Sequence, residues 1–159
     1  MIGYEVMIKK TSSYARLKYL FGIWQDFSKI VGNVYSINDD YTIQIEEDFE
    51  RMHYKSATKW ILSASDENNH QQEDTVIQRM DRDKDIYNFI KYWAKSINGN
   101  YLDELERELI IRKWLLNQKH ECICRECYIS RRTYFRKVKE AERILILLWK
   151  LEYYGNVEI

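Results

Sequence analysis

The three cysteines of the chain follow a histidine within one short stretch, in the order His120, Cys122, Cys124 and Cys127. Thiolates and imidazoles are typical zinc ligands, but a zinc site usually takes them as two pairs separated by a loop. On one short helix only Cys124 and Cys127 would share a face, and such a helix cannot easily surround a metal ion. The sequence therefore predicts no metal site. We expect Ile123, Cys124 and Cys127 to occupy buried positions of a short helix instead.

The other residue types capable of chemistry form no recognisable catalytic arrangement. His53 and His70 have no nucleophile or carboxylate at a suggestive spacing. The sequence contains no phosphate-binding loop, hydrolase nucleophile turn or metallohydrolase signature. We therefore expect a protein that is not an enzyme, has no catalytic residues and binds no cofactor.

A second set of residues has the charge needed to bind nucleic acid. Between Arg131 and Lys139, five of the nine residues are basic and none is acidic. On a helix with ~100° per residue, an apolar stripe forms on one side: Tyr134, Val138, Ala141, Leu145 and Leu148. The opposite face then carries Arg132, Phe135, Arg136, Lys139 and Arg143. Arginine guanidinium groups pair with guanine edges, and arginine and lysine both bind phosphate. A solvated basic face on a core helix is the simpler alternative.

The residues before this helix favour a helix-turn-helix at about 121–152. A short helix at 121–127 comes first, and Ser130 is a suitable N-cap for the long helix that follows. Tyr128 stands where such turns often have glycine, and a bulky residue with positive φ is strained. We therefore expect either an open turn or a second helix shifted by one residue.

These residues resemble a known family. The run from Ile129 to Arg136, followed by Ala141, resembles the signature of the ArpU and RinA group of phage transcriptional regulators, whose C-terminus is similar to the helix-turn-helix of primary sigma factors. The resemblance extends over roughly residues 70–152 through the polar stretch at His70–Asp74 and Arg82–Lys84. It implies a sequence-specific DNA-binding activator of phage late genes in the bacterial cytoplasm. The recognition positions that it implies are Arg131, Arg132, Phe135, Arg136 and Lys139.

The composition predicts an all-α fold, with a helical N-terminal part and a C-terminal helix-turn-helix domain. The chain has no proline and five glycines, and strand-like alternation is scarce. We expect an N-terminal helical region at 1–66, a polar linker at 67–75 and the DNA-binding domain at 76–159. The expected helices span about 14–31 (ended by Gly32), 42–64, 86–97, 102–117, 121–127 and 130–153. A strand at 41–45 is the alternative to the start of the second helix.

The charge distribution matters more than the total, because the net charge is zero. Residues 39–85 carry thirteen acidic and six basic residues, whereas residues 86–159 carry fourteen basic and ten acidic ones. The acidic segment is a candidate contact for host RNA polymerase, and double-stranded DNA is the expected partner of the basic one. No apolar run is long enough to span a membrane, and the N-terminus has no signal-peptide pattern, so we expect a cytoplasmic protein.

The last helix is apolar on every side between Ile144 and Trp149. Such a segment should be buried all round, either by the N-terminal helices or by a second copy of the chain. We favour a homodimer, because paired recognition helices read half-sites one DNA turn apart. Two rival functions stay open: a helix-turn-helix-shaped interaction module or phage inhibitor that binds a host protein, and a small nucleic-acid enzyme.

Overall fold

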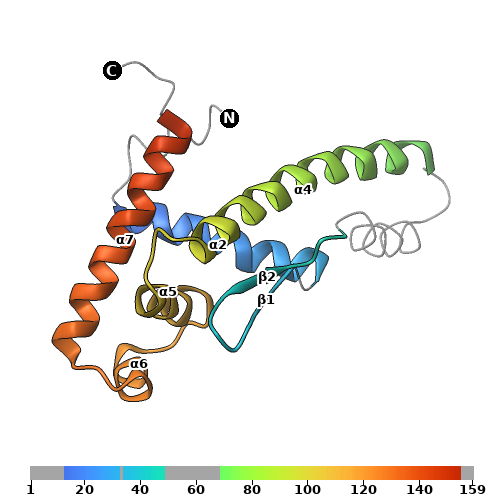
Figure 1. The fold of residues 1–159 in the computed structure, drawn as a ribbon. Helices are drawn as coiled ribbons and strands as arrows, with labels where there is room; N and C mark the ends of the chain where they lie inside the picture. Colours follow the sequence, from blue (N-terminus) through green and yellow to red (C-terminus); the bar gives the residue numbers. More distant parts are fainter. Residues whose placement is uncertain (1–12, 33, 49–68, 155–159) are drawn as a thin grey trace. The chain divides into compact units, whose positions relative to one another are not determined.

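The computed structural model describes residues 13–32, 34–48 and 69–154 (Figure 1). This part is mostly helical, which confirms the all-α class, although it also contains a two-stranded hairpin. The elements are α2 (Ser13–Val31), β1 (Tyr35–Ile37), β2 (Ile43–Ile45), α4 (Asn69–Asn98), α5 (Glu104–Ile110), a π-helical segment η2 (Ile111–Leu115), α6 (His120–Cys127) and α7 (Arg131–Tyr154). None of the described helices is long and apolar enough to cross a lipid bilayer.

The contacts divide the chain into two compact units, residues 1–22 with 97–159, and residues 23–96. This division differs from the predicted one, in which residues 67–75 separate two domains. The polar stretch that we expected to be a linker is helical from Asn69 onward. A polar sequence without proline or glycine can continue a helix whose packing is supplied by its apolar end, which here begins near Tyr87.

A β-hairpin in residues 23–96 corrects the predicted helix at 42–64. Strands β1 and β2 pair antiparallel, with Tyr35 opposite Ile45. The Asp40 carboxylate accepts hydrogen bonds from the backbone N–H and the hydroxyl of Thr42, at 3.1 and 2.6 Å. This local turn competes with helix formation, and the alternation after it suits a strand. The strand alternative at 41–45 therefore holds for Ile43–Ile45, whereas residues 49–64 lie outside the described part.

Residues 23–96 have their own apolar core. Trp24 is fully buried and meets the ring of Tyr35 edge-on, with 5.3 Å between ring centroids. The Tyr87 hydroxyl donates a hydrogen bond of 2.6 Å to the Glu46 carbonyl and so connects α4 to the end of β2. As predicted, α2 stops at Gly32, whose φ of 89° is a conformation that glycine adopts without strain.

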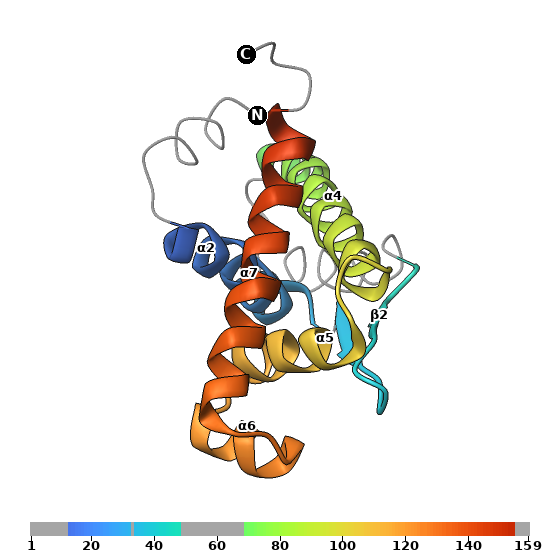
Figure 2. The ribbon, with the colours of Figure 1, turned by 60° about the vertical axis from the view of Figure 1, so that its left-hand side comes forward.

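The unit made of residues 1–22 and 97–159 contains α5, η2, α6 and α7, and Figure 2 shows α5 and α6 beside the start of α7. Helix α5 begins with a capping box, in which Asp103 accepts from the Glu106 N–H at 2.7 Å and Glu106 accepts from the Asp103 N–H at 3.0 Å. The buried core residues come from α5, α6 and α7: Leu109, Ile123, Tyr134 and Val138. The three helices therefore form one packed trihelical body, the scaffold that a helix-turn-helix requires.

The N-terminal part of α2 covers one side of this unit. Trp114 of η2 packs against Phe21, with 5.6 Å between ring centroids, and Tyr19 contacts Trp149 at 6.4 Å. Part of the apolar run Ile144–Trp149 is thereby buried, as expected. Within the single chain this burial is incomplete, because Leu147 is 43% exposed. A single covering helix cannot enclose all sides of α7.

Candidate nucleic-acid interface

The turn between α6 and α7 is closed by a tyrosine in the left-handed conformation. Tyr128 has φ 56° and ψ 42°, and its N–H donates to the Cys124 carbonyl. The Ile129 N–H donates to the same carbonyl, at 3.1 Å. Both alternatives that we expected, an open turn and a second helix shifted by one residue, are therefore wrong. Tyr128 therefore has the strained left-handed backbone conformation, and its side chain is 94% exposed.

Ser130 begins the second helix as predicted. Its hydroxyl oxygen accepts a hydrogen bond from the Thr133 N–H at 3.1 Å, and its carbonyl accepts one from the Tyr134 N–H at 2.9 Å. This is the N-cap arrangement, which satisfies one of the otherwise free N–H groups of the first turn. The remaining N–H groups of that turn make the start of α7 attractive to anions.

The two faces of α7 lie as the helical periodicity predicts. Tyr134, Val138, Ala141 and Leu145 are buried, while Leu148 at the end of the stripe is half-buried. The opposite face consists of exposed residues: Arg132, Phe135, Arg136, Lys139 and Arg143. The exposed Arg131 lies at the edge of this face, beside the stripe. All six predicted site residues therefore come together on one solvent-facing surface, which we call the basic face.

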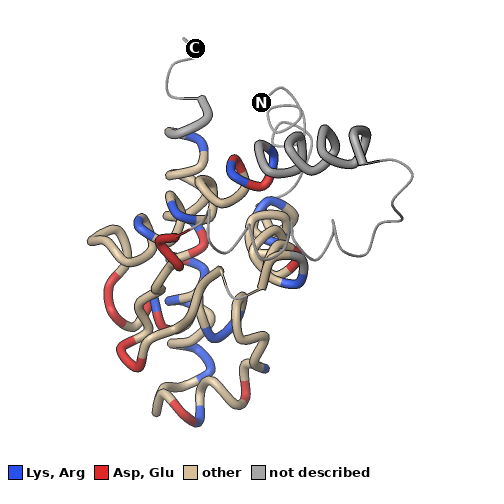
Figure 3. Tube along the Cα trace, turned by 90° about the vertical axis from the view of Figure 1, so that its right-hand side faces the viewer, with Lys and Arg blue, Asp and Glu red and all other residues tan. Residues whose placement is uncertain are grey.

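Three other cations among the described residues of this unit are held by carboxylates of a neighbouring element. Lys137 Nζ lies 2.9 Å from Asp103 at the start of α5, and Lys113 Nζ lies 2.5 Å from Glu142 on α7. The buried Arg112 donates to Glu108 at 3.1 Å, and also to Glu126 and Gln118. These pairs join the helices to one another, and Figure 3 shows that both signs of charge occur along the same helices.

The basic face itself is largely unpaired. Among the residues that the structure describes, Arg132, Arg136 and Lys139 have no ion-pair or hydrogen-bond partner. Arg143 differs, because its Nη2 lies 2.5 Å from Glu140. The hydrogen bonds from Arg143 lower the pKa of the Glu140 carboxyl. Arg143 is thus already partly neutralised.

A ring cluster at the start of the basic face was missed by the sequence reasoning. The imidazole of His120, the first residue of α6, lies 5.3 Å from the Phe135 ring and 6.2 Å from the Tyr134 ring. The Arg131 guanidinium lies 5.6 Å from the centroid of Phe135. We had considered His120 only together with the cysteines. Its contact with Phe135 depends on how two helices approach each other, which helical periodicity does not report.

The cysteines of α6 take part in packing and hydrogen bonding. Cys124 and Cys127 are only partly buried, whereas Ile123 is fully buried, so the expected burial is correct for Ile123 alone. Cys127 Sγ donates to Glu108 at 2.8 Å. Burial first, and the Glu108 carboxylate second, raise the pKa of the Cys127 thiol to about 12. No group of three ligating side chains that could hold a metal occurs within the described ranges.

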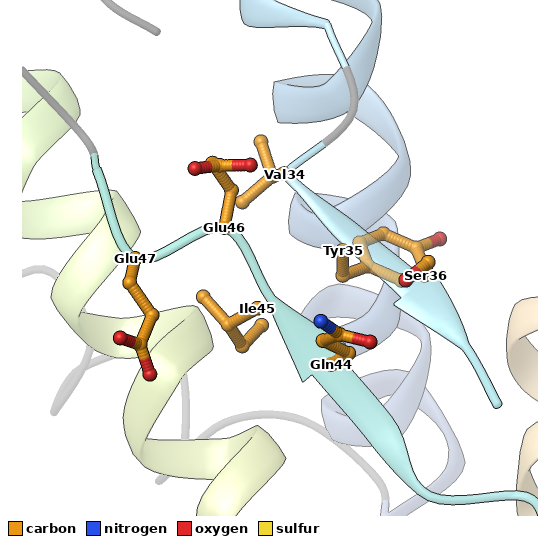
Figure 4. Close-up of a pocket in the computed structure, with 7 residues that line it drawn as sticks. All are labelled: Val34, Tyr35, Ser36, Gln44, Ile45, Glu46 and Glu47. Carbon is orange, nitrogen blue, oxygen red and sulfur yellow. The ribbon is translucent and has the colours of Figure 1, made fainter. Parts of the chain in front are cut away.

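A hollow of about 520 Å³ lies beside the hairpin of the other unit (Figure 4). It is lined by Val34, Tyr35, Ser36, Gln44, Ile45, Glu46 and Glu47. Two carboxylates and no cation line it, so it would repel phosphate groups. The basic face of α7 is therefore the better candidate for a nucleic-acid interface.

No protein-family model, no characterised protein and no solved structure matches the chain. The function is therefore inferred from the chemistry of the residues described above.

Proposed function

We propose that the protein is a sequence-specific DNA-binding transcriptional regulator, which places α7 in the major groove of double-stranded DNA. The observation that supports this best is the set of unpaired cations on the basic face. Arg132, Arg136 and Lys139 are exposed without a partner among the described residues, although other cations of the unit, such as Lys113 and Lys137, are matched by carboxylates. Free guanidinium groups on an exposed helix face are well suited to an anionic partner.

The position of each cation suggests its role. Arg132 and Arg136 lie one turn apart in the first two turns of α7, the part of a recognition helix that meets base edges. An arginine there can donate two hydrogen bonds to O6 and N7 of guanine. Arg131, beside the turn, and Lys139, farther along the helix, suit phosphate contacts. Arg143 makes the smallest contribution, because Glu140 already accepts its hydrogen bonds.

The biological role that we propose is activation of phage late genes in the cytoplasm of a bacterial host. It rests on the resemblance of Ile129–Arg136 to the phage regulator signature. The protein acts by binding rather than by catalysis. The acidic residues 39–85 are proposed to contact host RNA polymerase, since activators commonly work by joining DNA and polymerase through different surfaces.

A homodimer is part of this proposal. Leu147 and Leu151 of α7 are 43% and 68% exposed, and Ile144 on the same side is half-buried. These three residues form an apolar stripe at helical spacing that a second copy would cover. Sedimentation velocity at about tens of micromolar should show a dimer that dissociates when Leu147 and Leu151 are both changed to Lys. Only monomer in the unaltered protein would contradict a homodimer.

The test of DNA binding uses the purified full chain and fragments of its own phage genome. At physiological salt we expect one intergenic fragment to bind, and the double variant Arg132→Ala/Arg136→Ala to lose about 1–3 kcal/mol of binding free energy per arginine. The matched control is Lys91→Ala/Lys95→Ala, which removes two exposed cations from α4. This control should bind as the unaltered protein does.

The salt dependence separates DNA binding from the rival functions. The slope of log affinity against log salt should be about −0.9 for each phosphate contacted, and Lys139→Ala should reduce its magnitude by about one contact. Salt-insensitive capture of a host protein through the basic face, without DNA binding, would instead identify an interaction module or inhibitor. Metal-dependent cleavage of plasmid DNA would identify a nuclease.

A further inference from the structure

One residue of the basic face cannot form hydrogen bonds with its side chain. Phe135 lies in the second turn of α7 between Arg132 and Arg136, and it is 47% exposed. A single exposed apolar residue is common on protein surfaces, but this ring stands between two cations on the proposed recognition helix. What this ring binds is therefore a question separate from what the arginines bind.

Three neighbours contact the Phe135 ring. The Tyr134 ring meets it edge-on, with 5.1 Å between centroids and 74° between planes. His120 of α6 lies 5.3 Å away, and the Arg131 guanidinium lies 5.6 Å from the ring centroid. These contacts restrict the side-chain rotamer, while almost half of the residue still faces solvent. The result is a fixed apolar surface on the proposed recognition helix.

The major groove offers one apolar group to such a surface, the C5-methyl of thymine. Apart from the small C5–H group of cytosine, the base edges there present hydrogen-bond donors and acceptors. A phenyl ring against those polar atoms would remove their water without replacing its hydrogen bonds, which is unfavourable. Against a methyl group the same ring gains buried apolar area. The ring therefore discriminates for a methylated pyrimidine and against the alternatives.

We propose that Phe135, positioned by His120 and Arg131, reads the C5-methyl group of a thymine in the operator. This inference rests on the proposed DNA binding through α7 and adds a base preference to it. His120 is a positioning residue here: it acts on the DNA through the Phe135 ring.

The experiment begins with selection of high-affinity duplexes from a random DNA pool by the full-length protein. Each thymine of the selected site is then replaced, one at a time, by deoxyuridine, which lacks only the methyl group. At one thymine in each half-site the substitution should weaken binding about fourfold, the value expected for ~0.8 kcal/mol per buried methyl-sized group. The protein is unchanged in this arm, so no folding defect can affect the result.

Two variants then assign the effect to the ring. Phe135→Ala should bind the thymine and deoxyuridine sites equally. His120→Ala should lose most of the discrimination while it keeps the salt dependence that the phosphate contacts produce. Thermal melting checks that both variants are folded, and Lys150→Ala, an exposed residue near the other end of α7, is the control that should keep the fourfold preference.

Failure of this inference can be distinguished from failure of the proposed function. If the protein selects no duplex, DNA binding itself is refuted, and the inference falls with it. If it selects a site but no deoxyuridine substitution weakens binding, DNA binding stands and methyl recognition is refuted. The same holds if the preference for thymine persists in Phe135→Ala.

Discussion

Replacing Tyr128 by glycine should stabilise the protein, although it removes an aromatic side chain. Tyr128 closes the turn between α6 and α7 with φ 56° and ψ 42°. An L-residue other than glycine pays about 1–2 kcal/mol for this conformation, because its Cβ crowds the following carbonyl oxygen. The Tyr128 side chain is 94% exposed, so its removal sacrifices almost no packing. The backbone hydrogen bonds to the Cys124 carbonyl do not involve the side chain and are retained.

The expected gain is smaller than the strain, because glycine also gives the unfolded chain more freedom. The greater entropy of the unfolded chain offsets about 0.5–1 kcal/mol of the strain that is relieved. The net effect on the free energy of unfolding should therefore be a gain of about 0.5–1 kcal/mol. For a chain of this length, that gain corresponds to a rise of roughly 1–4 °C in melting temperature.

Urea denaturation and scanning calorimetry measure both quantities. The control is Tyr128→Ala, which removes the ring but keeps the Cβ, and which should leave the stability nearly unchanged. A glycine variant that is less stable than the unaltered protein would refute the backbone-strain argument. An alanine variant as stable as the glycine variant would show that the exposed ring, rather than the backbone, causes the cost.

Three further perturbations test other features. Gly32→Ala should lower the free energy of unfolding by about 1–2 kcal/mol, because φ is 89° there, and an unchanged urea midpoint would contradict this. Ser130→Ala should cost about 1 kcal/mol through the lost cap on the Thr133 N–H, whereas Ser130→Asp should keep most of it. The pKa of Cys127 is raised from 9.0 to about 12, so its contribution to stability is present below pH 9 and is lost as the pH rises toward 12. The stability difference between the unaltered protein and Cys127→Ala should shrink over that range. Iodoacetamide at pH 8 should modify Cys127 far more slowly in the folded protein than in urea, and equal rates would contradict the raised pKa.

Much of the C-terminal unit follows from local sequence patterns. The 3.6-residue period correctly separates the buried and exposed faces of α7 over residues 131–143, because this part of the helix packs along one side only. The Ser130 cap and the end of α2 at Gly32 are local backbone events, and they too were predicted correctly. These features depend on neighbours within about one helical turn, which the sequence displays directly.

The incorrect or missed features arise where a local turn competes with a helix, or where a contact between two helices decides the result. The helix expected at 42–64 does not form at its start, where the structure has a turn made by Asp40 and Thr42. This turn gives the backbone a different set of hydrogen bonds. The ring contact between His120 and Phe135 depends on the crossing of two helices. The ion pair between Lys137 and Asp103 also depends on such a tertiary contact. It leaves Lys137 paired, whereas its sequence neighbours Arg132 and Arg136 are unpaired among the described residues.

The ion pairs of Arg112, Lys113 and Lys137, in a chain of zero net charge, affect how such a protein would spread along a chromosome. Attachment to arbitrary DNA grows with the number of phosphates neutralised, and a cation already paired with a carboxylate contributes less to it. A genome presents about 10⁶–10⁹ competing sites, so weak attachment to each of them leaves more of the protein in free solution. A regulator of zero net charge with part of its cations already paired would therefore need fewer copies per cell to occupy its operator than a uniformly basic protein of equal specific affinity.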